Sequence, residues 1–230
     1  EIHLHPAVIK KVLWAMQNSQ AGQVIFTTHS PLFIKPITLP QVVRFIKEKN
    51  STKAFSLTQH NLDVHRLIQE LNADNLEMFF ADKVLLVEGV SDKLLVRSLI
   101  DKFYQGDKDI KVIQTHGKGN VKIYVHLLDI YKIPYTIMLD RDATKTQQLR
   151  TLMHHMDINL PPLKDEELIK SLKKYNIYIL PNGDLEANYP RRYQNEDSKS
   201  LNALRAARQI RQSDFDSKGM TNLKEIINSL

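Results

Sequence analysis

The chain has 230 residues, of which 42% are apolar and 25% charged, a composition typical of globular proteins that excludes disorder as its main state. The absence of cysteine excludes disulfide scaffolds, thiolate zinc sites and cysteine nucleophiles. The formal net charge of +6 suits a polyanionic partner, and no apolar run approaches the roughly 20 residues that span a bilayer, so we expect a cytoplasmic protein without a membrane partner.

The first 80 residues predict short elements of mixed type. Residues 8–18 carry apolar side chains at helical spacing, and Val24–Thr28 is an apolar run typical of a buried strand. Residues 41–58 alternate in polarity on both sides of a polar turn, which predicts a hairpin. Residues 62–79 predict a helical connector. The pattern changes after Phe80, so we expect a domain boundary there.

From residue 81 onward, apolar strands alternate with helices. The strands are expected at residues 84–87, 110–114, 135–139 and 177–180. The helices are expected at residues 91–104, 121–131, 144–155, 168–175, 201–212 and 223–230, with Ser91 capping the first. This alternation predicts an α/β fold, a mostly parallel sheet flanked by helices and followed by C-terminal helices.

Acidic residues follow two of the expected strands directly. Glu88 follows the first strand and Asp140 the third, while Asp92 and Asp142 lie close behind them. Because the carboxyl ends of parallel strands share one edge, these acids should converge. Each acid alone would more often be a helix-start charge or a solvated turn residue. Together they repel unless some protonate or a divalent cation lies among them, and oxygen-only ligands favour Mg²⁺ or Mn²⁺.

A glycine-containing loop, residues 116–120, separates the second strand from its helix. Its two glycines allow close backbone approach, and the helix start offers free N–H groups, so a phosphate could bind there with Lys118 as its counter-charge. The spacing is not that of a Walker A loop. A tight turn without a ligand is the alternative.

These motifs together resemble a Toprim domain, the metal-binding module shared by topoisomerases, primases and some nucleases. The first 80 residues resemble the C-terminal part of an ABC-type ATPase: residues 1–6 are similar to the segment just past its Walker B acids, and residues 27–31, with His29, to its switch-histidine loop. An ATPase followed by a Toprim domain is similar to the OLD (overcoming lysogenization defect) family of nucleases, which has relatives in phage defence. The motifs that carry the Toprim resemblance are residues 86–92, 117–120 and 139–143.

The resemblance implies a DNA-cutting site with two divalent ions. Glu88, Asp92 and Asp140 would hold one ion, and the second would be shared by Asp140, Asp142 and Glu186, the last from the motif Asp184-Leu185-Glu186. The resemblance also implies a downstream lysine that stabilises the transition state, Lys199, with Lys218 as its rival. ATP would act only in the full-length protein, because the chain lacks a Walker A loop and His29 alone cannot hydrolyse ATP.

Several arginines are placed where DNA phosphates could bind. Any binding would be led by the DNA backbone and sensitive to salt, since no aromatic residues are interleaved for base stacking. A charged helical stripe is about as often a solvated face. The candidates are Arg191, Arg192, Arg205 and Arg208, the last two in a stripe with Arg211.

The resulting hypothesis is a metal-dependent endodeoxyribonuclease. Residues 1–80 would be the end of an ATPase domain whose core is missing from the chain, and residues 81–230 the Toprim nuclease domain. One alternative is a Toprim enzyme that acts on RNA or resembles a topoisomerase or primase; another is a non-catalytic module that binds DNA or a partner. The sequence leaves open the nucleic-acid preference, nicking against double-strand cleavage, the role of ATP, and whether the chain forms a homodimer or a higher oligomer.

Overall fold

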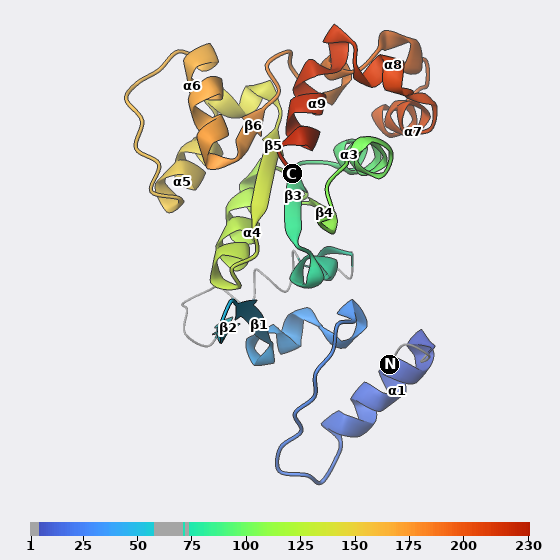
Figure 1. Ribbon diagram of the computed structural model, residues 1–230, viewed down its shortest axis with the longest axis vertical. Helices are drawn as coiled ribbons and strands as arrows, with labels where there is room; N and C mark the ends of the chain where they lie inside the picture. The colour runs from blue at the N-terminus through green and yellow to red at the C-terminus, as the bar shows by residue number, and fades with distance from the viewer. Residues whose placement is uncertain (1–4, 58–70, 72–73) are drawn as a thin grey trace. The chain divides into compact units, whose positions relative to one another are not determined.

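Figure 1 shows the computed structural model of the chain, which describes residues 5–57, 71 and 74–230. The chain divides into two compact units, Glu1–Phe80 and Ala81–Leu230. Most of the connector expected at residues 62–79 lies outside the described residues; its described end is a 3₁₀ helix, η4 (Asn75–Phe80). Among the described residues, no helix is both long enough and apolar enough to cross a membrane.

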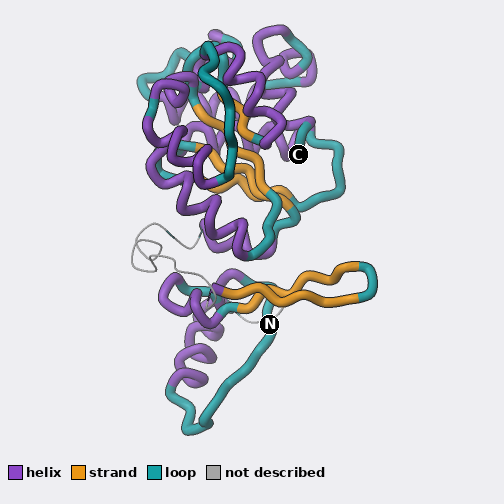
Figure 2. The backbone as a smooth tube through the Cα atoms, turned by 90° about the vertical axis from the view of Figure 1, so that its left-hand side faces the viewer, coloured by secondary structure: helices purple, strands orange, loops and turns teal. Residues whose placement is uncertain are grey.

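In its described residues, the first unit contains one α-helix and one hairpin. Helix α1 (Pro6–Gln17) is followed by two 3₁₀ helices, η1 (Pro31–Phe33) and η2 (Pro36–Gln41). Strands β1 (Val43–Glu48) and β2 (Ser51–Ser56) then pair antiparallel, which confirms the predicted hairpin. Figure 2 shows the two strands running side by side to their connecting turn.

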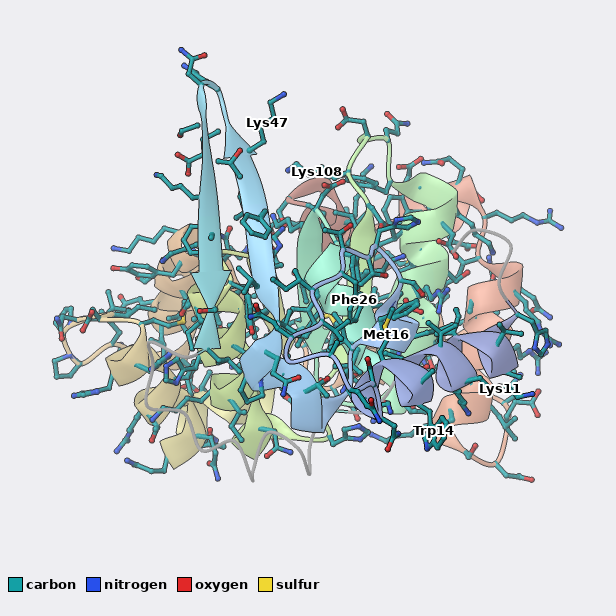
Figure 3. All side chains as sticks on the ribbon, turned by 90° about the horizontal axis from the view of Figure 1, so that it is seen from below. Lys11, Trp14, Met16, Phe26, Lys47 and Lys108 are labelled. Carbon is teal, nitrogen blue, oxygen red and sulfur yellow. The ribbon has the colours of Figure 1, made fainter. Side chains whose placement is uncertain are left out.

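The strand predicted at Val24–Thr28 was wrong. This segment is a loop in which the side chain of Ile25 is 82% exposed. An apolar run forms a strand only where a neighbouring strand supplies hydrogen bonds, and none of the described strands pairs with it. Phe26 contacts Phe33, with their ring centroids 5.4 Å apart, and Trp14 is 67% exposed (Figure 3). The described part of this unit therefore leaves large apolar side chains uncovered.

The second unit is built on a four-stranded parallel sheet. Its strands are β3 (Lys83–Val87), β4 (Ile110–Gln114), β5 (Tyr135–Leu139) and β6 (Ile177–Ile179), in the order β4-β3-β5-β6. The central strand β3 pairs with both β4 and β5, and all five of its residues are buried. Burial of every residue means that both faces of the sheet are covered, as the continuous apolar strands predicted.

Helices cover the two faces in separate groups, as Figure 1 shows. One face carries α4 (Lys118–Ile130), α5 (Gln147–His155) and α6 (Asp165–Leu172). The other carries α3 (Val90–Phe103), α7 (Lys199–Gln209) and α9 (Thr221–Asn228), with the short α8 (Gln212–Phe215) between the last two. On this second face, Leu85 and Val87 share one apolar core with Leu99 and Ala203. The structure thus has the α/β fold that the sequence predicted.

Two differences from the predicted helices concern candidate site residues. The N-cap of α3 is Gly89 rather than Ser91, because the Asp92 carboxylate reaches back to accept a hydrogen bond of 2.8 Å from the Gly89 N–H. The helix expected at 201–212 begins at Lys199 and ends at Gln209, so Arg211 is not part of a helical stripe with Arg205 and Arg208.

The loop that leads into α4 imposes a backbone conformation that only glycine adopts easily. Gly117 has φ +112° and ψ 164°, whereas Gly119 lies inside the helix with open space around its Cα. We expect Gly117→Ala to lower stability by about 1–3 kcal/mol, and Gly119→Ala to raise it by about 0.5–1 kcal/mol. Thermal unfolding of both variants checks this pair, and equal effects would contradict it.

Candidate metal centre

An acidic cleft of about 520 Å³ lies at the carboxyl edge of the parallel sheet. Glu88 follows β3, Asp140 follows β5, and the segment that carries Glu186 follows β6. Their convergence was predicted by the edge rule, that the carboxyl ends of parallel strands lie at one edge of a sheet. This rule depends only on the strands being parallel. The cleft is lined by Glu88, Gly89, Ser91, Asp92, Gln114, His116, Gly117, Asp140, Leu185, Glu186 and Lys199.

Glu88 and Asp140 meet although 52 residues separate them in sequence. The Asp140 N–H donates a 3.0 Å hydrogen bond to Glu88 Oε1. One carboxylate oxygen from each of Glu88, Asp140 and Asp142 lies within 4.8 Å of the others. These three residues are therefore close enough to share one ion after small side-chain rotations.

Asp92 and Glu186 extend the acidic wall. Asp92 is only 7% exposed and is held by its bond to the Gly89 N–H. The Glu186 side chain is 16% exposed, and its Oε1 atom is buried without a hydrogen-bond partner. A buried carboxylate oxygen without a donor is costly unless a cation approaches it.

The crowding of these acids shifts their pKa values. Burial, followed by the charges of Asp92 and Glu88, raises the pKa of Asp140 to about 7. Burial also raises the pKa of Asp92 to about 6, against the pull of the Gly89 N–H, and raises that of Glu88. The all-oxygen donor set and the unsatisfied Glu186 oxygen fit a hard divalent cation such as Mg²⁺ or Mn²⁺.

Two lysines form ion pairs with different acids of this region. The Lys118 ammonium forms an ion pair with Asp142 and lies 3.7 Å from Glu88 Oε2. Lys199 Nζ lies 2.7 Å from Asp184 Oδ2 and 3.3 Å from Glu186 Oε2. Of the two lysines that the sequence left as rivals, Lys199 lines the cleft, whereas Lys218 begins the short helix η9 (Lys218–Met220) and is absent from the lining.

The arginines expected to bind DNA differ in their contacts. Arg192 pairs with Asp214, and Arg205 lies 3.0 Å from Glu196, so both have acidic partners within the chain. The residues Arg191 and Arg208 are exposed. His29, the expected switch histidine, is exposed in the loop before η1.

Sequence reasoning gave no role to Gln114, which also lines the cleft. Gln114 is the last residue of β4, and its side-chain amide lies 3.2 Å from His116 Nδ1. The edge rule could have found it, because the end of β4 lies beside the end of β3. Only carboxylates were considered as candidates at the strand ends, and Gln114 carries an amide.

Arg141 connects the loop after β5 to the loop after β6. The sequence analysis did not predict this role. Its backbone N–H donates a 2.9 Å hydrogen bond to Gly183 O, and its guanidinium donates to Pro181 O and, at 2.6 Å, to Glu166 Oε1. The residue between Asp140 and Asp142 thus anchors the loop that carries Glu186. Its position between two acids gave no sequence signal for this contact.

We expect Arg141→Ala to weaken Mn²⁺ binding about tenfold, because groups that orient metal ligands commonly contribute this much. Glu166→Gln removes one partner of Arg141 but keeps the Pro181 contact, so its effect should be smaller. Calorimetric titration with Mn²⁺ measures both variants. Equal dissociation constants for Arg141→Ala and the unaltered chain would contradict the anchoring role.

Comparison with known proteins shows similarity to one group of nucleases. Residues 79–142 match the family described as overcoming lysogenization defect protein-like, TOPRIM domain, and residues 1–68 match a protein family of unknown function, DUF2813. An OLD nuclease from Thermus scotoductus is 25% identical in an alignment of length 158 that covers 62% of this chain and 30% of the relative. The chain therefore spans about 30% of the length of that curated relative.

Solved structures with a similar arrangement include two C-terminal regions of OLD proteins. That of Xanthomonas campestris pv. campestris has 19% identity and a TM-score of 0.49, over 65% of this chain and 93% of that one. That of Burkholderia pseudomallei has 13% identity and a TM-score of 0.47, over 64% of this chain and 97% of that one. Residues 79–142 are therefore similar to the Toprim domain of the OLD-like family, and the chain is related in sequence to an OLD nuclease.

Proposed function

We propose that this chain is the nuclease part of a longer OLD-type protein and that it hydrolyses DNA phosphodiester bonds with two Mg²⁺ or Mn²⁺ ions. The single observation that carries the proposal is the meeting of carboxylates from three strand ends in one cleft, around Asp140. The name of the related OLD nuclease supports the reaction class. Two divalent ions here would lower the pKa of a water nucleophile and stabilise the leaving 3′ oxygen.

Each residue has a proposed role. Glu88, Asp92 and Asp140 would hold the first ion, while Asp142 and Glu186 would join Asp140 around the second. Lys199 would neutralise charge on the scissile phosphate. This role of Lys199 is supported by the position of Lys199 on the cleft wall beside Glu186. The proposed role of Asp142 rests on its carboxylate oxygen, which lies within 4.8 Å of those of Glu88 and Asp140. That of Glu186 rests on its buried Oε1 atom, which has no hydrogen-bond partner.

DNA and an ATPase core are the proposed partners. The net charge of +6 and the exposed residues Arg191 and Arg208 support a backbone-led DNA contact. The exposed apolar side chains of the first unit, Ile25 among them, support a missing ATPase core that would cover them. ATP would act only in that longer protein.

Supercoiled plasmid incubated with Mg²⁺ or Mn²⁺ tests the proposal. The unaltered chain should nick or linearise the plasmid, and chelation of the metal should stop it. Asp140→Ala should be inactive, whereas Asp107→Ala, which removes an exposed acid from the loop before β4 at the opposite edge of the sheet, should cut normally. Equal cutting by the unaltered chain and Asp140→Ala would remove the mechanism.

A parallel assay with RNA of the same length decides the substrate. Faster cleavage of RNA would replace the DNA assignment and keep the metal site. Failure to cut either polymer, together with Mn²⁺ binding that Glu88→Ala leaves unchanged, would favour a non-catalytic binding module.

A further inference from the structure

Lys118 occupies a place among the carboxylates that a cation is expected to fill. It is the first residue of α4, and its ammonium contacts Asp142 and lies 3.7 Å from Glu88 Oε2. These two acids belong, with Asp140, to the group whose ligand atoms lie within 4.8 Å of one another. The lysine therefore neutralises two of the carboxylates that would coordinate a metal ion.

The ammonium and a divalent ion cannot share this place. Mg²⁺ needs its carboxylate oxygens at about 2.0–2.1 Å, and two cations this close repel strongly where water is partly excluded. The Lys118 side chain is only 20% exposed, so its charge is poorly screened. Burial opposes this charge, but the bond to Asp142 and the field of Glu88 outweigh burial and raise the pKa of Lys118.

We propose that Lys118 is an internal counter-ion, that a divalent metal displaces it from Glu88 and Asp142, and that the released ammonium then contacts a phosphate oxygen of the DNA strand. The second half of this inference rests on the proposed nuclease function; the displacement itself does not. A lysine suits the exchange, because its ammonium is a compact point charge on a flexible four-carbon chain. Metal loading would thus convert a lysine bound to acids into one available to substrate.

The exchange makes a prediction opposite to that for a supporting residue. If Lys118 competes with the metal, Lys118→Met should bind Mn²⁺ about fivefold more tightly, the order expected for one partly exposed ion pair. Lys122→Met, which removes an exposed lysine one turn further along α4, should bind as the unaltered chain does. Calorimetric titration of the 230-residue chain measures both. Weaker or unchanged binding by Lys118→Met would overturn the proposal.

A second measurement needs no variant and no cleavage. Amine-reactive labelling of the unaltered chain, read by mass spectrometry, should increase several-fold at Lys118 when Mn²⁺ is added, while labelling at Lys122 stays constant. Labelling at Lys118 that does not rise with Mn²⁺ would overturn the displacement, even if the Met variant failed to fold.

Binding of a fluorescent DNA duplex with Ca²⁺ in place of the catalytic ion tests the phosphate contact. Lys118→Met should bind the duplex several-fold more weakly than Lys122→Met, and equal binding would overturn this contact. An unaltered chain that neither binds nor cuts DNA would remove the proposed nuclease function instead. The titration and the labelling would still decide the displacement in that case.

Discussion

Asp140→Asn is expected to reduce Mn²⁺-dependent plasmid cleavage about 1,000-fold or more, because a metal ion supplies several kcal/mol of transition-state stabilisation. Asp140 contributes to the candidate three-acid group and is the residue that both proposed ions share. The asparagine retains the shape of the side chain and the backbone N–H that bonds Glu88. Loss of activity would then report the lost charge rather than a rearranged loop.

The same substitution is expected to stabilise the metal-free protein at neutral pH. The pKa of Asp140 rises from its ordinary 3.8 to about 7 in the folded state. Below pH 3.8 the carboxyl is protonated in both states, so it contributes nothing. Between pH 3.8 and 7 the unfolded state ionises first, so stability falls as the pH rises, and the full penalty applies above pH 7.

Solvent screening limits this penalty, because Asp140 is only partly buried. We expect about 1–2 kcal/mol, which is about 2–8 °C in melting temperature for a chain of this size. The gain of Asp140→Asn over the unaltered chain should be largest above pH 7 and vanish near pH 4. Added Mn²⁺ should raise the melting temperature of the unaltered chain far more than that of the variant. A variant that is less stable than the unaltered chain at pH 8 without metal would contradict the crowding of acids.

Lys199→Met is expected to reduce the cleavage rate at saturating metal about 100-fold, the usual loss when one charged group that faces the transition state is removed. Lys199 is the lysine on the cleft wall, beside Glu186. Its own acidic partners, led by Asp184, raise the pKa of Lys199, so it remains charged at any working pH. Mn²⁺ affinity should not fall, since the metal ligands remain.

Lys218→Met provides the matched control, because Lys218 is an exposed lysine outside the cleft lining. Single-turnover cleavage of one labelled duplex compares the two variants, and Lys199→Arg should recover part of the rate by restoring the charge. A larger loss in Lys218→Met than in Lys199→Met would reverse the assignment. Full activity in both variants would exclude Lys199 and Lys218 as the lysine that stabilises the transition state.

The sheet and its acidic edge were predictable because the underlying rules are local. Residues 84–87, four of the five buried residues of β3, form a continuous apolar run, and the acid that follows such a run in a parallel sheet lies at the shared edge. Glu88 and Asp140 needed no knowledge of distant contacts to be paired. The order β4-β3-β5-β6 agrees with the alternation of strands and helices, which predicted a parallel sheet.

What escaped prediction depends on contacts between segments far apart in sequence. Val24–Thr28 has the composition of a strand, yet no described strand lies beside it. Arg141 lies between two acids in sequence. Its hydrogen bond to Pro181 O forms only once the loop after β6 has folded beside it. The glycine-containing loop predicts Lys118 as a phosphate ligand, but in the folded chain Lys118 forms an ion pair with Asp142.

The central place of β3 also has a consequence for biosynthesis. β3 is the first strand of its sheet to leave the ribosome, and both of its neighbours, β4 and β5, come later in the chain. Its second edge cannot pair until β5, which ends at Leu139, has been synthesised. Before β4 is synthesised β3 offers two unpaired edges, and one edge stays unpaired until β5 follows. An unpaired edge on a short β-forming sequence is what drives nascent chains to aggregate. Chaperone demand during translation should therefore peak between the synthesis of β3 and that of β5.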